Sequence, residues 1–430
     1  MIGLGIVKDF KEKPLPLTSR CYALKYLDFV DFTYKPKETD LTCTFRVEPE
    51  GISLKESAGG VAAESSVGTW TELTTEQPYV KRLAAHVFGI EGNIIKIAYP
   101  IELFEPANMP NILSSLAGNV FGLKALKNLR LLDIKMPKTL INSFRGPAYG
   151  LEGIRKLLKV AKRPLVGTII KPKLGLRTKD HAKVAYSAWL GGCDIVKDDE
   201  NLSSQAFNPF EERLAATLES RDKAQSETGE RKVYMINITA ETNTMLKRAQ
   251  AVVDHGGEYV MIDILTCGWS VLQTLRNQNL KLVIHAHRAG HAAFTKKPEH
   301  GIAMRLIVTV ARVIGVDQLH VGTVVGKMSE TKEEVIENIV ACKAELGGLK
   351  PVLPVASGGL HPRLVPALLE TFGNDVVIQA GGGIHGHPGG SVAGAKAMRQ
   401  AVDAALEGKT LEEYAKTHGE LKVALALWKA

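Results

Sequence analysis

From residue 147 onward the chain repeats one pattern eight times: a short run of β-branched and apolar residues, then a stretch with helical spacing. The predicted strands are 165–170, 193–196, 233–238, 259–264, 282–286, 318–321, 352–355 and 376–379. Between them, apolar residues recur three and four positions apart, as in the stretch containing Met245, Ala249 and Val252. A doubly wound sheet normally has fewer strands, so the pattern predicts an α/β fold of the (β/α)₈ TIM-barrel type.

The residues before the barrel divide into two parts. Residues 1–25 contain Lys8, Lys11, Pro14 and Pro16 and are predicted to form an N-terminal arm. Residues 26–145 mix strand-like runs (41–47 and 93–99) with helix-like runs (54–64 and 110–117), which predicts an α+β domain of ferredoxin-like type. Residues 146–430 are assigned to the barrel, with a helical tail at the C-terminus.

Composition argues against several classes of protein. The sequence has no run of 18 apolar residues and no secretory signal pattern, so we expect a cytoplasmic protein without a membrane partner. The five cysteines lack CxxC spacing and are expected to be small buried thiols rather than disulfide or zinc ligands. The net charge of +8 is small for 430 residues and no basic run is present. A nucleic-acid-binding protein is therefore a remote alternative, and an anionic small substrate explains the charge equally well.

Polar residues gather where the predicted strands end. Active sites of (β/α)₈ barrels are built from the C-terminal ends of several strands, so these residues are expected to meet at one mouth. They follow seven of the eight strands and comprise Lys171, Lys173, Lys197, Asp199, Glu200, Asn237, His285, His287, Arg288, His291, His320, Lys327, Ser357–Gly359 and Gly381–Gly383.

The stretch 191–202, reading GGCDIVKDDENL, places a lysine beside three acidic residues. Asp199 and Glu200 are oxygen ligands suited to Mg²⁺, but two carboxylates alone bind it poorly. Lys197 could supply the third anionic ligand if its neutral amine captured CO₂ as a carbamate, and a simple ion pair with Asp199 is the alternative. Asp198, between Lys197 and Asp199, is expected to point away and do little.

Two glycine-rich turns, Ser357–Gly359 and Gly381–Gly383, can expose backbone N–H groups to a phosphate. Arg288 and His320 form a second cationic pole, so a bisphosphorylated substrate is indicated. Two further loops have open interpretations. The stretch 322–329 carries Lys327 and is either a lid or a plain surface loop, and the polar run 64–70 is either a turn or the rim of a ligand site.

These residues lie in motifs that closely resemble the large subunit of ribulose-1,5-bisphosphate carboxylase/oxygenase (RuBisCO), above all its archaeal form III type. The barrel motifs are GTIIKPKLG (167–175), GGCDIVKDDEN (191–201), HAHRAGHAAF (285–294), HVGTVVGK (320–327), SGGLHP (357–362) and QAGGGIHGHP (379–388). AAESSVGTW (62–70) and AGNVFGLKALKNLRLLD (117–133) extend the likeness into the first domain. The likeness covers nearly everything after the N-terminal arm.

The resemblance implies carboxylation of ribulose 1,5-bisphosphate by CO₂ to two molecules of 3-phosphoglycerate, with competing oxygenation by O₂, through an enediolate stabilised by Mg²⁺. It implies Lys197 as the carbamylated metal ligand and proton acceptor, beside Asp199 and Glu200, with Lys171, His287, Lys327 and Glu64 as the other catalytic residues. The implied substrate-binding residues are Lys173, Arg288, His320, Ser357, Gly358, Gly359, Gln379, Gly381, Gly382, Thr69, Trp70 and Asn119.

The resemblance also implies an assembly, in which Glu64, Thr69, Trp70 and Asn119 reach the site of a neighbouring subunit. A homodimer or a ring of dimers is therefore expected, without a small subunit, and AMP salvage is the implied pathway. Ile169, Gly290, Val321 and Ala380 depart from the plant pattern without removing a charge, which puts rate and CO₂/O₂ selectivity in doubt. The main alternative is a RuBisCO-like protein that enolises or isomerises another phosphorylated sugar.

Overall fold

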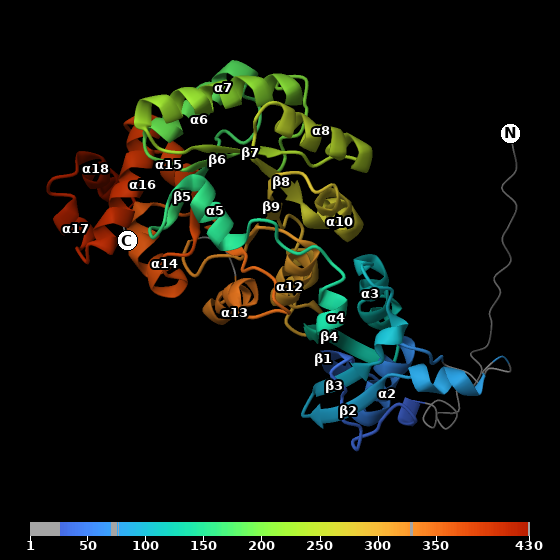
Figure 1. The fold of residues 1–430 in the computed structure, drawn as a ribbon. Helices are drawn as coiled ribbons and strands as arrows, with labels where there is room; N and C mark the ends of the chain where they lie inside the picture. The colour runs from blue at the N-terminus through green and yellow to red at the C-terminus, as the bar shows by residue number, and fades with distance from the viewer. Residues whose placement is uncertain (1–25, 70–74, 76, 327–329, 429–430) are drawn as a thin grey trace, which may run out of the picture.

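The computed structural model describes residues 26–69, 75, 77–326 and 330–428. The predicted arm (1–25), Trp70 and Lys327 lie outside these described residues. A smaller N-terminal part, blue in Figure 1, packs beside a large barrel that runs from green to red. None of the described helices is both long and apolar enough to cross a membrane.

The N-terminal part is built on a mixed sheet with the strand order β10-β4-β1-β3-β2. Its strands are β1 (Leu41–Pro49), β2 (His86–Glu91), β3 (Ile94–Tyr99) and β4 (Leu126–Lys135), which pair antiparallel. The fifth, β10 (Gly301–Ile302), comes from the barrel sequence and pairs with β4 in parallel. Helix α2 (Leu54–Glu64) begins at a capping box formed by Ser53 and Glu56 and buries Val61 against the sheet.

Eight parallel strands close into the predicted barrel, in the order β11-β12-β13-β5-β6-β7-β8-β9. Each overlaps one predicted strand, and no end differs from the prediction by more than two residues. The strands are β5 (Leu165–Ile169), β6 (Ile195–Lys197), β7 (Val233–Asn237), β8 (Tyr259–Asp263), β9 (Val283–His287), β11 (Gln318–His320), β12 (Leu353–Ser357) and β13 (Val377–Ala380).

Helices surround the barrel and connect its strands (Figure 1). The longer ones are α5 (Gly150–Leu158), α6 (Thr178–Leu190), α7 (Phe210–Thr228), α8 (Thr242–Asp254), α10 (Trp269–Asn277), α12 (Met304–Ile314), α13 (Lys332–Lys343), α14 (Val365–Phe372), α16 (Gly390–Leu406) and α18 (Gly419–Leu427). Shorter helices are α4 (Lys138–Ile141), α9 (Ile264–Cys267), α11 (Ala292–Thr295), α15 (Gly382–His385) and α17 (Leu411–Tyr414), and the N-terminal part contains α3 (Met109–Leu116). The 3₁₀ helices are η1 (Pro78–Leu83), η2 (Ile101–Leu103), η3 (Asn119–Gly122) and η4 (Pro362–Leu364).

The apolar interior of the barrel closes one of its ends. Side chains from the starts of the strands, such as Ile195, Val233 and Val283, pack against Ile154 and Leu158 of α5. Because one end is plugged by apolar packing, a ligand cavity is left to the opposite end, where the strands finish.

The cysteines agree with the prediction of reduced thiols. Cys43, Cys193 and Cys342 are buried and Cys267 is partly buried, and all four are free. Cys21 lies outside the described residues.

Candidate active site

A cavity of about 790 Å³ opens at the C-terminal ends of the barrel strands. Residues that follow six different strands line it, so side chains far apart in sequence converge on one space. From the predicted site, the structure brings together Lys171, Lys197, Asp199, Glu200, His287, Arg288, His320, Ser357, Gly358, Gly359, Gln379, Gly381 and Gly382.

Lys197 is the last residue of β6, and its side chain is 1 % exposed. Its Nζ donates to the carbonyl of Asp198 at 2.7 Å and lies 3.4 Å from Glu200 Oε2. Burial lowers the pKa of this amine, although Glu200 and Asp199 oppose the shift. A lowered pKa makes the neutral, nucleophilic form easier to reach.

The ion pairs differ from the predicted alternative, in which Lys197 pairs with Asp199. Asp199 instead accepts from Lys171 Nζ at 2.8 Å, and Lys197 pairs with Glu200. Burial alone would raise the pKa of Glu200, but Lys197 and His287 outweigh it and lower that pKa to about 2. The ionised carboxylate of Glu200 is therefore stabilised by positive charge at Lys197.

The donor set at this position suits Mg²⁺ only in part. Asp199 and Glu200 supply two carboxylates, and no cluster of three His, Cys, Asp or Glu side chains able to hold a metal occurs in the described part of the chain. A third anionic group is needed to complete a hard oxygen site. Carbamylated Lys197 would provide it, so the residues fit Mg²⁺ if this lysine is modified.

A carboxylate that the sequence analysis missed orients one of the cavity histidines. Asp263, the last residue of β8, contacts His287 Nδ1 at 2.6 Å, while His287 Nε2 lies 3.6 Å from Glu200 Oε2. The sequence analysis predicts this strand as residues 259–264. Asp263 therefore falls inside the predicted strand, and no polar residue is predicted at its end. A charged residue next to the end of a predicted buried strand was the available signal.

Several buried polar atoms of the cavity have no hydrogen-bond partner among the described residues. They are Arg288 Nη1, His320 Nε2 and both amide atoms of Gln379. Ser357 Oγ lies 2.9 Å from His320 Nδ1 and is positioned beside them. Because buried polar groups are normally satisfied, these atoms indicate a polar ligand.

The glycine turns leave room on the same wall. Gly358 and Gly359 have φ angles of 122° and 78°, which favour glycine. A Cβ at Gly381 would lie 3.0 Å from Cε of Lys171, so a side chain there would crowd this lysine. Both turns thus keep backbone accessible beside the cavity.

Other predicted site residues do not join this cavity in the same chain. Glu64, Thr69 and Asn119 belong to the N-terminal part, and Lys173 lies exposed after β5. None of these four is among the residues that line the cavity. Burial raises the pKa of Glu64. Of the four departures from the plant pattern, Ile169 and Gly290 line the cavity, while Val321 and Ala380 are buried.

Asp198 points away from the cavity as expected, but the expectation that it does little is wrong. Its carboxylate is completely buried and is contacted by groups from α6, α7 and β7. The contacts are Arg213 Nε at 3.1 Å, His181 Nε2 at 3.1 Å, Tyr234 OH at 2.6 Å and the Asn237 N–H at 3.0 Å. Asp198 therefore anchors the strand end that carries Lys197 and Asp199.

Comparison with known families agrees with this arrangement. The sequence model for the ribulose bisphosphate carboxylase large chain, catalytic domain, matches residues 150–428, and the model for the N-terminal domain of the same chain matches residues 28–140. The chain belongs to the RuBisCO large-chain family. The two matches together span both parts of the fold, and the first includes the residues that line the cavity.

Relatives of known sequence and structure are archaeal RuBisCOs. The chain is 49 % identical to the ribulose bisphosphate carboxylase of Methanocaldococcus jannaschii, over 94 % of this chain and 100 % of the relative. It is 53 % identical to that of Pyrococcus furiosus, over 94 % and 97 % of the two chains.

Two solved structures show the same fold. An octameric RuBisCO from Pyrococcus horikoshii, in complex with sulfate ion, superposes with a TM-score of 0.91 at 51 % identity, over 94 % of this chain and 98 % of the other. A dimeric RuBisCO from Hyperthermus butylicus gives 0.88 at 44 % identity, over 94 % and 99 %.

Proposed function

We propose that this protein carboxylates ribulose 1,5-bisphosphate with CO₂ to give two molecules of 3-phosphoglycerate, with O₂ as a competing substrate. The observation that carries the proposal is the buried Lys197 amine, of lowered pKa, beside Asp199 and Glu200 in a cavity with unpartnered polar atoms. Relatives about half identical to this chain are named ribulose bisphosphate carboxylase.

Lys197 has two roles in this proposal. The ammonium group first loses one proton, and the neutral amine then forms an N–C bond to CO₂ and loses a second proton, so that a cation is converted into a carbamate anion. The carbamate, Asp199 and Glu200 would then hold Mg²⁺, which would supply positive charge next to an enediolate. The same carbamate accepts the proton from C3 of the substrate, because it is the anionic group of the buried strand end.

Two further side chains would transfer protons. Lys171 lies on the cavity wall with its amine 2.8 Å from Asp199, and we assign it the later acid and base steps. His287 is oriented through Nδ1 by Asp263, which leaves Nε2 toward Glu200 and the cavity. Lys327, outside the described residues, is proposed to polarise CO₂.

The substrate's two phosphates would bind to two separate groups of cavity residues. We assign Arg288, His320 and Ser357 to one phosphate, because their unpartnered or cavity-facing groups cluster. Gly381 and Gly382, at the start of α15, would donate backbone N–H groups to the other. Lys173, Gly358, Gly359 and Gln379 complete the proposed contacts with the substrate.

Incubation with labelled bicarbonate, Mg²⁺ and ribulose 1,5-bisphosphate tests the carboxylation. Labelled 3-phosphoglycerate is the expected product. An unlabelled sugar-phosphate isomer in its place would contradict the carboxylase assignment and favour the RuBisCO-like alternative. Substrate supply from AMP breakdown, a cytoplasmic location and the absence of a small subunit are further parts of the proposal.

We propose that Glu64, Thr69, Trp70 and Asn119 complete the site of a neighbouring subunit in a homodimer or ring of dimers. Three of these residues, Glu64, Thr69 and Asn119, are described by the structure, and none of them lines the cavity of its own chain, which supports the proposal. Co-expression of Glu64→Gln with Lys197→Ala is the test, because a hybrid dimer regains one intact site. We expect about a quarter of the natural activity after random pairing. Each variant alone is the control, and no recovery in the mixture would contradict a shared site.

A further inference from the structure

Glu330 turns its carboxylate inward, onto the guanidinium that is proposed to bind phosphate. The residue lies just before α13, and its Oε1 accepts a hydrogen bond from Arg288 Nη2. Its side chain is only 10 % exposed. A Cβ at Gly322 would lie 3.3 Å from both the Arg288 Nη2 and the Glu330 carboxyl carbon, so the pair packs directly over this glycine.

This inward orientation differs from that of the neighbouring acidic residues. Glu333 and Glu334 are exposed in the first turn of α13, and Glu334 forms a capping box with Thr331. Acidic side chains at a helix start are ordinarily stabilised there by the helix dipole and by solvent. Glu330 is instead largely removed from solvent and pairs with one guanidinium. Its Oε2 has no hydrogen-bond partner among the described residues.

Arg288 is the charged group that balances Glu330. The only other described side chain within ion-pair distance is His291, whose Nε2 lies 3.7 Å from Oε1. Burial, reinforced by Arg288, lowers the pKa of His291 to about 4, so this ring is neutral at pH 7. The positive charge of Arg288 is therefore balanced by the carboxylate of Glu330. A second anion that binds Arg288 would compete with Glu330 for this charge.

We propose that Glu330 is an internal counter-ion that competes with the substrate's phosphate for Arg288 and thereby weakens anion binding in the resting protein. The proposal rests on the assignment of Arg288 to phosphate under the proposed function. Guanidinium binds phosphate best through two parallel N–H groups. Nη1 is unpartnered, but Nη2, the other end of the guanidinium fork, is held by Glu330 until the carboxylate moves away.

Removal of the carboxylate charge tests the competition. Inorganic phosphate is the probe, and its dissociation constant is measured by calorimetry at fixed ionic strength. We expect Glu330→Gln to bind phosphate about tenfold more tightly, because a charge-assisted bond to Arg288 no longer has to be exchanged. The KM for ribulose 1,5-bisphosphate should fall in the same direction.

Glu333→Gln is the matched control, since it removes the same charge three residues away from an exposed position. It should change phosphate affinity by less than about twofold, as expected for a screened surface charge. Arg288→Gln combined with Glu330→Gln should abolish the gain. If Glu330→Gln unfolds, as judged by circular dichroism, Glu330→Ala and Glu330→Met serve in its place.

Other outcomes would overturn one of the two proposals. Unchanged or weaker phosphate binding in Glu330→Gln would overturn the proposal and make Glu330 a residue that merely positions Arg288. The binding measurement requires no turnover. If phosphate binds more tightly in the variant while no labelled 3-phosphoglycerate forms in the natural protein, the carboxylase assignment fails and the counter-ion survives.

Discussion

Replacement of Asp198 by asparagine is expected to destabilise the fold strongly, because this carboxylate neutralises a cation that water cannot reach. Asp198 and Arg213 are both 0 % exposed, and their paired atoms lie 3.1 Å apart. Asparagine has nearly the same size but no charge, and its single acceptor oxygen would face the three donors Arg213 Nε, Tyr234 OH and the Asn237 N–H. Loss of one partner of a buried ion pair costs about 3–5 kcal/mol.

The pH dependence of the free energy of unfolding gives a separate value for the contribution of the Asp198 charge. Burial alone would raise the pKa of Asp198, but Arg213 and His181 lower it from 3.8 to about 2. This difference corresponds to about 2 kcal/mol of folding free energy. Because the pKa is lower in the folded state, the contribution is complete at neutral pH and is lost as pH falls from about 4 to 2. Asp198→Asn should lack this loss, so natural protein and variant should converge in acid.

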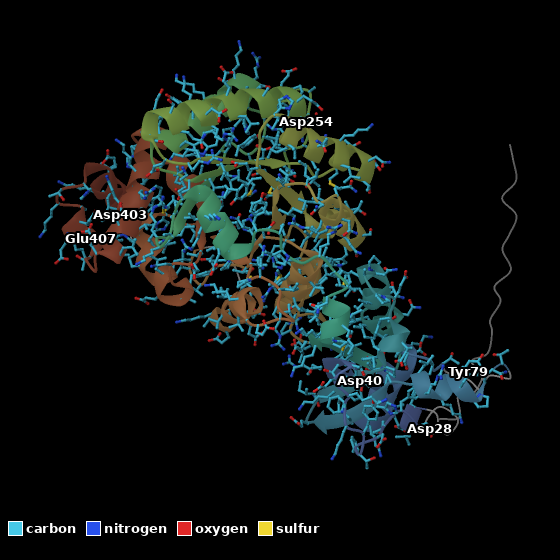
Figure 2. The ribbon with its side chains drawn as sticks, in the orientation of Figure 1. Asp28, Asp40, Tyr79, Asp254, Asp403 and Glu407 are labelled. Carbon is cyan, nitrogen blue, oxygen red and sulfur yellow. The ribbon has the colours of Figure 1, made fainter. Side chains whose placement is uncertain are left out.

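Urea unfolding followed by circular dichroism at pH 7 and at acid pH measures both effects. Asp254→Asn is the control, because Asp254 lies exposed at the end of α8 (Figure 2) and should change stability by less than about 0.5 kcal/mol. A second variant, Asp198→Asn with Arg213→Met, removes both charges and should recover part of the loss. A destabilisation below about 1 kcal/mol, or equal pH dependence in the two proteins, would refute the reasoning.

Three further substitutions test the cavity. Lys197→Ala should abolish turnover even at saturating Mg²⁺, since the third anionic ligand is lost; substantial residual activity would mean that no carbamate is needed. Gly167→Ala would place a Cβ 2.2 Å from Gln379 Oε1, so we expect a loss of about 1–3 kcal/mol in urea unfolding and a higher KM, and no change in either would contradict this packing. Trp428 stacks on His361 with ring centroids 5.4 Å apart and lines the cavity; Trp428→Ala should raise KM several-fold with kcat nearly constant, whereas the reverse pattern would argue against a binding role.

The barrel could be predicted because each strand is a short apolar run followed by a polar end. Local pattern therefore located β6 and β9, and it also located most of the residues that line the cavity. The elements of the N-terminal part were harder to predict from the sequence. Helix α2 was predicted with its observed bounds, but β2 and β4 were not predicted as strands. Charged residues interrupt β4, which is stabilised by β1 on one side and by β10, far away in sequence, on the other.

The parts of the site that sequence could not supply depend on contacts between distant residues. The pairing of Glu330 with Arg288 joins positions 42 residues apart, and nothing in the local pattern of either predicts it. The burial of Asp198 depends on Arg213 and Tyr234, which lie on different elements. Spacing identifies which side chains can reach a strand end, whereas tertiary packing decides which of them face the cavity.

The pairing of β10 with β4 makes the two parts of the chain mechanically continuous. Arg130 of β4 donates to the carbonyls of Thr295 and Lys297, and Lys297 Nζ donates to Asn128. This seam ties the N-terminal sheet to the segment that leaves β9 and carries His291. A cut in the chain near residue 146 would leave β1 to β4 on one fragment and β10 on the other, so the edge of β4 that β10 covers would be exposed on the N-terminal fragment.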